Sequence, residues 1–314
     1  MHYMQNSTQK SRFDGIAHVR MHLMMARLRL IARGPLTAWP AVFVASLLVA
    51  GCASAPLDRA GSLQAYDDLT PSDGLLTRSL QKVSKDDVLA AKTVRIIPTA
   101  FSEAAGNAAF TDDQRNLVTN AADRALCAGL SERFQVVGPS EPADLTVHAV
   151  VTHVVPTDPV AVGFSKGASV AKTVLLPAVP VPVPRIPIGL GSLSLEAEAR
   201  DVAGAQKAAM IWGRNANALV DQGRVAREGD AYTLAVAFGD DFSKLLVTGK
   251  TPFGGLPSVP SIDKLGAQLG GAPKYPACEV FGRAPGLVGM IGDGIGLPPD
   301  WTDKGAKAAQ TSSN

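Results

Sequence analysis

The chain has 314 residues, of which 46% are hydrophobic, 18% are charged and 5% are aromatic. This composition is typical of globular proteins and excludes both a highly charged disordered polymer and a protein with many membrane-spanning helices. Lys and Arg outnumber Asp and Glu by 30 to 28, but six of the basic residues and only one acid lie in the first 51 residues. The other 263 residues carry a net charge of −3, which excludes the basic surface of a nucleic-acid-binding protein.

The first 51 residues have the order of a bacterial export signal, because basic residues are followed by an uncharged stretch from Gly34 to Cys52. The apolar part is shorter than the roughly 20 residues of a membrane-spanning helix, and it contains Pro40. It ends in Leu48-Val49-Ala50-Gly51-Cys52, which resembles the lipobox of bacterial lipoproteins. This resemblance implies a diacylglycerol on the Cys52 thiol, cleavage before Cys52, and acylation of the new amino terminus, for example by palmitate.

The alternatives to lipidation are a plain signal peptide and an uncleaved anchor in which Cys52 is present by chance. We expect a lipoprotein because the charge order, the apolar length and the cysteine coincide. Ala53 stands where lipoproteins of the inner membrane usually carry Asp, so the resemblance implies the periplasmic face of the outer membrane. A translation start at Met21, Met24 or Met25 would give a leader of more ordinary length.

The remainder of the chain divides by composition into three parts. We expect a lipidated tether over residues 52–63, an α/β domain over 64–250, and a Gly/Pro-rich tail over 251–314 that is loosely ordered and ends in disorder. The domain contains a Pro-rich loop over 174–191. Because no internal repeat is present, repeat architectures are excluded.

Local patterns predict the elements in the first half of the domain. A β-branched, apolar strand is expected at Thr93–Ala100. A helix then begins at Thr111, where Gln114 completes a capping box, and its broad apolar face is expected to pack on a sheet. Strands follow at Phe134–Val137 and at Leu145–Val155, and the second of these alternates strongly.

The second half of the domain contains two strands and a helix. Ser192–Val202 alternates between apolar and polar residues, which predicts a strand with one solvated face, and Ala208–Leu219 can pair with it. Asp230 is expected to cap a helix that runs through Leu246. This order predicts an α+β fold with a largely antiparallel sheet of about four to five strands and two helices on one face.

Several of these segments together carry a resemblance to a known family. Between about Leu63 and Leu246 the chain resembles an uncharacterised family of Gram-negative lipoproteins, domain-of-unknown-function family 3313. More distantly, the order of elements resembles small α/β modules of lipoproteins that serve envelope secretion and cell-wall assembly. The resemblance implies a fold and a location but no activity, and it does not extend to the Pro-rich loop or the tail. The matching segments are Tyr66-Asp67-Asp68-Leu69-Thr70-Pro71, the VRIIPTAF strand, the LSLEAEARDVAG strand and turn, and the helix from Asp230-Ala231-Tyr232 to Phe242.

Two acidic residues offer candidate chemistry. Glu196 and Glu198 lie two apart on one strand and therefore face the same side, where a carboxylate pair can serve acid–base catalysis or bind a cation. We favour the simpler interpretation that both belong to a solvated strand face, because alternation alone explains them.

No other residues form a catalytic or cofactor motif. His148 and His153 are five apart on a predicted strand, so they are expected on opposite faces and cannot share a metal ion unless the strand contains a bulge. A Gly-x-Ser-x-Gly elbow is missing, and the glycines from Gly289 to Gly296 are not followed by the Lys of a phosphate-binding loop. We therefore assign no catalytic, metal or cofactor residue.

The two cysteines that follow Cys52 are expected to pair. Cys127 is predicted on the outward side of its helix, and exposed cysteines in an oxidising periplasm usually form disulfides. Cys278 is the remaining partner, so a Cys127–Cys278 disulfide would fasten the tail to this helix. The alternative is two unrelated reduced thiols.

The Pro-rich segment Val174–Ile188 holds five prolines and is expected to be extended. It can present a binding strip to a partner or to the membrane surface, but we favour a fold back over the sheet. The function expected from these observations is a non-enzymatic lipoprotein that binds an envelope protein or a cell-wall partner. The alternatives are an enzyme or small-ligand binder that acts on cell-wall or lipid material through Glu196 and Glu198, and a purely structural spacer.

Overall fold

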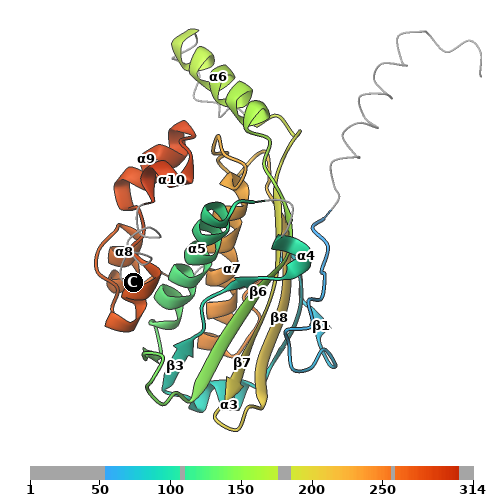
Figure 1. Ribbon diagram of the computed structural model, residues 1–314, viewed down its shortest axis with the longest axis vertical. Coiled ribbons are helices and arrows are strands. Elements are labelled where there is room, and N and C mark those ends of the chain that lie inside the picture. Colours follow the sequence, from blue (N-terminus) through green and yellow to red (C-terminus); the bar gives the residue numbers. More distant parts are fainter. Residues whose placement is uncertain (1–53, 107–109, 176–184, 256–258, 304–314) are drawn as a thin grey trace, which may run out of the picture. The chain divides into compact units, whose positions relative to one another are not determined.

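The computed structural model describes residues 54–106, 110–175, 185–255 and 259–303, and a mixed β-sheet lies at the centre of these residues (Figure 1). The sheet contains eight strands among the described residues. They are β1 (Thr70–Pro71), β2 (Thr77–Val83), β3 (Thr93–Ile96), β4 (Ala100–Phe101), β5 (Gln135–Val136), β6 (Leu145–Val155), β7 (Ser192–Asp201) and β8 (Gln206–Asn215).

The strand order is β1-β2-β8-β7-β6-β3-β5, and β4 pairs with the far part of β6. The four pairs β1–β2, β2–β8, β8–β7 and β7–β6 are antiparallel. The pairs β6–β3, β3–β5 and β4–β6 are parallel. The α+β class is therefore as predicted, and the sheet is largely antiparallel with short parallel pairs. The predicted number of four to five strands is too low. Strands β3 and β5 run parallel because helix α5 lies between them in the chain and carries it back to the end of the sheet at which β3 begins. A crossover helix is the usual connection between parallel strands.

Two long helices cover one face of the sheet (Figure 1). The first of them, α5, begins with the predicted capping box: the Gln114 N–H donates to Thr111 Oγ1 over 3.3 Å, and the Thr111 N–H donates to Gln114 Oε1 over 3.0 Å. The second, α7, ends at Gly249, whose left-handed φ of 61° favours glycine. The described helices are α3 (Lys85–Ala90), α4 (Glu103–Gly106), α5 (Asp112–Leu130), α6 (Pro159–Leu175), α7 (Gly229–Thr248), α8 (Ile262–Gln268), the 3₁₀-helix η2 (Pro276–Phe281), α9 (Gly286–Ile295) and α10 (Pro299–Thr302).

The main hydrophobic core lies between this helix pair and the sheet. Trp212 of β8 meets Phe238 of α7 edge to face, with ring centroids 5.8 Å apart. The helices approach closely at Gly239, where a Cβ atom would lie 2.6 Å from the Cβ of Ala125. A larger residue at Gly239 would therefore force α5 and α7 apart.

The tail is more ordered than the composition predicted. Residues 259–303, called the C-terminal segment below, form α8, η2, α9 and α10. Cys127 and Cys278 are joined by a disulfide with their Cα atoms 5.9 Å apart, so the expected link is present. Cys127 is buried rather than exposed, because η2 covers the side of α5 that faces away from the sheet.

The Pro-rich segment differs from its prediction at both ends. Val174 and Leu175 end helix α6, while residues 176–184 lie outside the described ranges. Arg185 is buried and pairs with Asp230, through Nη1–Oδ1 and Nη2–Oδ2 distances of 2.7 and 3.1 Å. Asp230 therefore does not cap α7 as expected, because its carboxylate is used by Arg185 and by the Gly191 N–H.

Asp123 of α5 supports the β3–β4 connection from within the core. Its carboxylate accepts hydrogen bonds from the Thr99 N–H and, over 2.6 Å, from Thr99 Oγ1. Burial raises the pKa of Asp123 to about 7, although the hydrogen bonds from Thr99 act in the opposite direction. The folded state therefore binds a proton that the unfolded chain releases near pH 4.

This proton uptake predicts a pH-dependent stability. The free energy of unfolding is expected to fall as pH rises from about 4 to about 7, because in that window the folded state still holds the Asp123 proton that the unfolded chain has released. In Asp123→Asn this fall should shrink by on the order of 2–4 kcal/mol, as measured by urea denaturation across the pH range. The exposed Asp67→Asn is the matched control, and an equal fall in all three proteins would contradict the assignment.

Candidate functional site

Glu196 and Glu198 of β7 lie on the sheet face opposite α5 and α7, and residues 54–69, called the N-terminal strap, cover them. Both residues are 0% exposed. Glu196 Oε1 accepts hydrogen bonds from the Ser62 N–H and hydroxyl over 2.8 and 2.6 Å, and Glu196 Oε2 accepts one from the Tyr66 hydroxyl over 2.8 Å. Glu198 Oε2 accepts one from the Gln64 N–H over 2.8 Å.

The carboxylates therefore fasten the strap to the sheet. Burial raises the pKa of Tyr66, and its hydrogen bond to Glu196 raises it further, so the phenol keeps the proton that it donates. The expectation of a solvated strand face is wrong, because Leu63 and Tyr66 pack over Ile211 and exclude water. Residues 54–63, expected to be a tether, include the buried Ala55 and lie packed on this face.

His148 and His153 lie on the same face of β6, contrary to the sequence prediction. A bulge at Thr152 inserts one residue, so His148 is opposite Glu198 while His153 is opposite Ser194. Burial lowers the pKa of His148. His153 Nδ1 lies 3.4 Å from Asp58 Oδ2. Among residues 54–303, outside the gaps named above, no group of three His, Cys, Asp or Glu residues is arranged to hold a metal ion.

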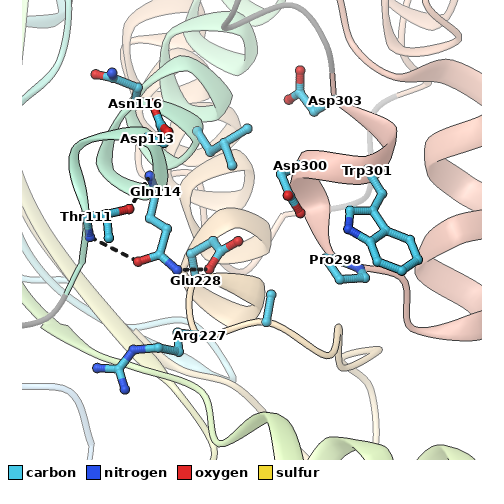
Figure 2. Close-up of a pocket in the computed structure, with 12 residues that line it drawn as sticks. Thr111, Asp113, Gln114, Asn116, Arg227, Glu228, Pro298, Asp300, Trp301 and Asp303 are labelled. Atoms are coloured by element: carbon cyan, nitrogen blue, oxygen red, sulfur yellow. Dashed lines mark hydrogen bonds between the residues drawn. The ribbon is translucent and has the colours of Figure 1, made fainter.

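A polar cavity of about 380 Å³ lies at the N-terminal ends of α5 and α7, where Pro298–Asp303 forms one wall (Figure 2). Glu228 at its base is buried, and its Oε2 accepts a hydrogen bond from Gln114 Nε2 over 2.8 Å. Burial raises the pKa of Glu228, and the negative charge of Asp300 raises it further. Trp301 belongs to the wall that Pro298–Asp303 forms (Figure 2).

An apolar cavity of about 430 Å³ lies between α5, α7 and the C-terminal segment. Small side chains on α5 leave this space open, since alanine extends only to Cβ. The disulfide forms part of the wall. The apolar lining comes from Ala121, Ala125 and Ala128 of α5, Val236 of α7, Leu265 and Leu269 of α8, and Pro285 and Met290 at the start of α9 and within it.

Arg124, which is mostly buried, and the buried Arg224 hold the C-terminal segment that closes both cavities. Arg124 of α5 pairs with Asp303, whose Oδ2 also accepts a hydrogen bond from the Tyr232 hydroxyl over 2.8 Å. Arg224 Nε lies 3.0 Å from Asp293 Oδ1, and its guanidinium stacks 5.1 Å from the centroid of the Tyr232 ring. Burial raises the pKa of Tyr232, which therefore stays neutral between the two cations.

Sequence reasoning did not single out these residues. Arg124 lies 108 positions before Tyr232, so only the packing of α5 against α7 brings the two arginines to the Tyr232 side chain. The cysteine pair is the one sequence signal that pointed to this region, because Cys278 joins η2 to α5. Phe281 lies three residues after Cys278, and its carbonyl oxygen accepts a hydrogen bond from Arg124 Nη1 over 3.2 Å.

The strap predicts a specific effect of a single substitution. Glu196→Ala leaves the Ser62 and Tyr66 donors without their acceptor, which should lower the free energy of unfolding by about 2–4 kcal/mol. Trypsin should then cleave after Arg59 faster than in the unaltered protein. The exposed Glu103→Ala is the control, and equal cleavage rates in both variants would refute a fastening role for Glu196.

No helix within the described ranges is long and apolar enough to cross a bilayer.

No curated protein matches the chain. Among solved structures it is similar to the PelC dodecamer from Paraburkholderia phytofirmans, with 12% identity and a TM-score of 0.32 over 56% of this chain and 100% of that chain. It is also similar to a DUF4136 family protein from Bacteroides thetaiotaomicron, with 9% identity and a TM-score of 0.29 over 57% and 100%. Similarity at this level supports no inference about function.

One family model matches the central part of the chain. It is described as a protein of unknown function, DUF3313, and it matches residues 58–242, from the strap through most of α7. The match includes every strand that the structure describes, all of α5 and most of α7. Because it covers more than half of the residues, the chain belongs to the DUF3313 family.

Proposed function

We propose that the protein is a non-enzymatic binding module of the periplasm, anchored to the outer membrane by lipid on Cys52. The structural observation that supports this location is the Cys127–Cys278 disulfide, because such bonds persist in oxidising compartments. The lipobox-like string that ends at Cys52 supports the anchor. Two or more acyl chains make membrane attachment effectively stable, whereas a single chain gives only reversible binding.

Binding is favoured over catalysis because the sequence's candidate carboxylates have another role. Glu196 and Glu198 are buried beneath the strap and accept hydrogen bonds from its backbone. Neither lines the polar or the apolar cavity. Anchoring confines the domain to a thin layer, so weak contacts with other envelope components can suffice.

The anchor is tested with Cys52→Ser in cells that are supplied with labelled palmitate. We expect the unaltered protein to incorporate label and to fractionate with the outer membrane. The variant should carry no label and should retain its leader, because lipid transfer to the thiol precedes cleavage. The Cys127→Ser/Cys278→Ser protein controls for general loss of cysteine and should remain labelled. An unlabelled native protein, or a labelled Cys52→Ser protein, would refute the proposal.

A second candidate function, binding of a small apolar molecule, is favoured by the apolar cavity. Ligand pockets are usually concave, mainly apolar and about 300–1,000 Å³ in volume, and this cavity of about 430 Å³ lies within that range. It has a rigid wall, since the disulfide and Arg124 hold the C-terminal segment in place. The ligand class would be an uncharged aromatic or aliphatic molecule.

Filling this cavity should abolish such binding. Ala128→Phe places a phenyl group in the space, and we expect the affinity for phenylnaphthylamine, a small apolar fluorophore, to fall by about tenfold or more, which corresponds to about 1.4 kcal/mol. The measurement is a fluorescence titration of the detergent-free Cys52→Ser protein, with Ala104→Phe on the exposed surface of α4 as the control. Equal affinities in both variants would exclude this cavity as the binding site.

A further inference from the structure

Helix α9 places its large apolar side chains outward and its small residues inward. Gly286, Gly289 and Gly292 are buried on the inner side. At 100° per residue four large apolar side chains fall within one sector of the helix, and we call this sector the outer face of α9. These residues, each 62–65% exposed, are Leu287, Val288, Ile291 and Ile295. Met290 lies at the edge of this sector and lines the apolar cavity. The arrangement is the reverse of an ordinary surface helix, which turns its apolar stripe toward the core.

Close packing holds the helix in this orientation. A Cβ at Gly289 would lie 2.5 Å from Pro285 Cγ, and one at Gly292 would lie 2.7 Å from Thr302 Cγ2. Asp293, the one charged residue of α9, accepts from Arg224 Nε over 3.0 Å. A rotation that buried the outer face would therefore drive large side chains into spaces that only glycine fits and would break the Arg224 pair.

The outer face has the composition of a surface that becomes buried in an apolar environment on binding. It contains no charged residue, and Trp301 of α10, a short helix that packs against α9, is 62% exposed. Exposed apolar patches of this kind mark contacts with proteins or membranes. Tryptophan is enriched at the boundary between lipid headgroups and acyl chains. Both properties suit a helix that lies in the plane of a bilayer surface.

The position of α9 links it to the amino terminus. The Val225 N–H donates to the Gly296 carbonyl oxygen over 2.8 Å, so the end of α9 lies against the connection between β8 and α7. The strap begins at the same end of the sheet, because the Ala55 carbonyl oxygen would lie 3.2 Å from a Cβ at Gly213, near the end of β8. Cys52 precedes the strap's first residue by only two positions.

We propose that the outer face of α9 docks on the phospholipid bilayer that holds the lipid anchor. The inference rests on the proposed lipidation of Cys52, which keeps this end of the domain at the membrane. A second copy of the chain is the other apolar surface that can cover the helix. The bilayer is favoured because a short chain connects the anchor to the end of the sheet that α9 also occupies.

The chain itself supplies a probe for this contact. After Cys52 it has two tryptophans, and Trp212 is fully buried while Trp301 is exposed on α10, which packs against α9. Lipidated protein is reconstituted in vesicles of phosphatidylethanolamine and phosphatidylglycerol in which some phospholipid carries brominated acyl chains. We expect bromine to quench the Trp301 emission, and a Trp301→Phe protein to show no such loss.

Two matched variants locate the contact. Leu287→Glu/Ile291→Glu places charge on the outer face and should abolish the quenching without changing the thermal unfolding midpoint, since both residues are exposed. Val202→Glu changes an exposed apolar residue in the β7–β8 turn, at the other end of the sheet, and should retain full quenching.

The remaining outcomes separate this inference from the anchor. If the lipidated protein shows no quenching, α9 does not meet the bilayer, although the palmitate label would still support the anchor. A dimer that the Leu287→Glu/Ile291→Glu protein cannot form, seen by analytical ultracentrifugation together with unquenched Trp301, would assign the outer face to a second copy instead. Loss of palmitate label from Cys52 would refute the proposed function itself.

Discussion

The attachment of the C-terminal segment to α5 and α7 is the constraint on which the cavities and the orientation of α9 depend. The Cys127–Cys278 disulfide joins residues 151 positions apart, and the chain-entropy treatment of so long a loop gives on the order of 5 kcal/mol. The ion pairs Arg124–Asp303 and Arg224–Asp293 fix the orientation of the segment. They add little net stability, because the loss of hydration of the buried charges offsets their attraction. Together these links hold the segment over the helices.

The extent to which the fold could be predicted follows from how local each signal is. The bounds of β6 agree with prediction because its first residues alternate and most of its residues are β-branched, and α5 is capped at Thr111 because a capping box is encoded within four residues. The face of His153 was predicted wrongly, since one bulge at Thr152 reverses every side chain beyond it. Short strands such as β1 and β4 have too few residues to show any period.

The candidate site was harder to predict, because a strand's pattern does not reveal what covers its polar face. Alternation around Glu196 and Glu198 is the pattern of a solvated face, yet the strap supplies donors that replace water. The same limit applies to α9. Its glycines resemble those of a loosely ordered tail, and only the neighbouring Pro285 and Thr302 show that they serve close packing.

The two terminal segments perform related tasks on opposite sides of the core. The strap covers the polar sheet face, and the C-terminal segment covers the helices, so most of the apolar surface that an α/β core leaves open is already occupied by the chain itself. The outer face of α9 is an apolar patch that this packing leaves exposed. A lipid attached two residues before a packed strap would allow the domain little freedom of orientation, and under that restriction a small apolar contact is enough to select one orientation at the membrane.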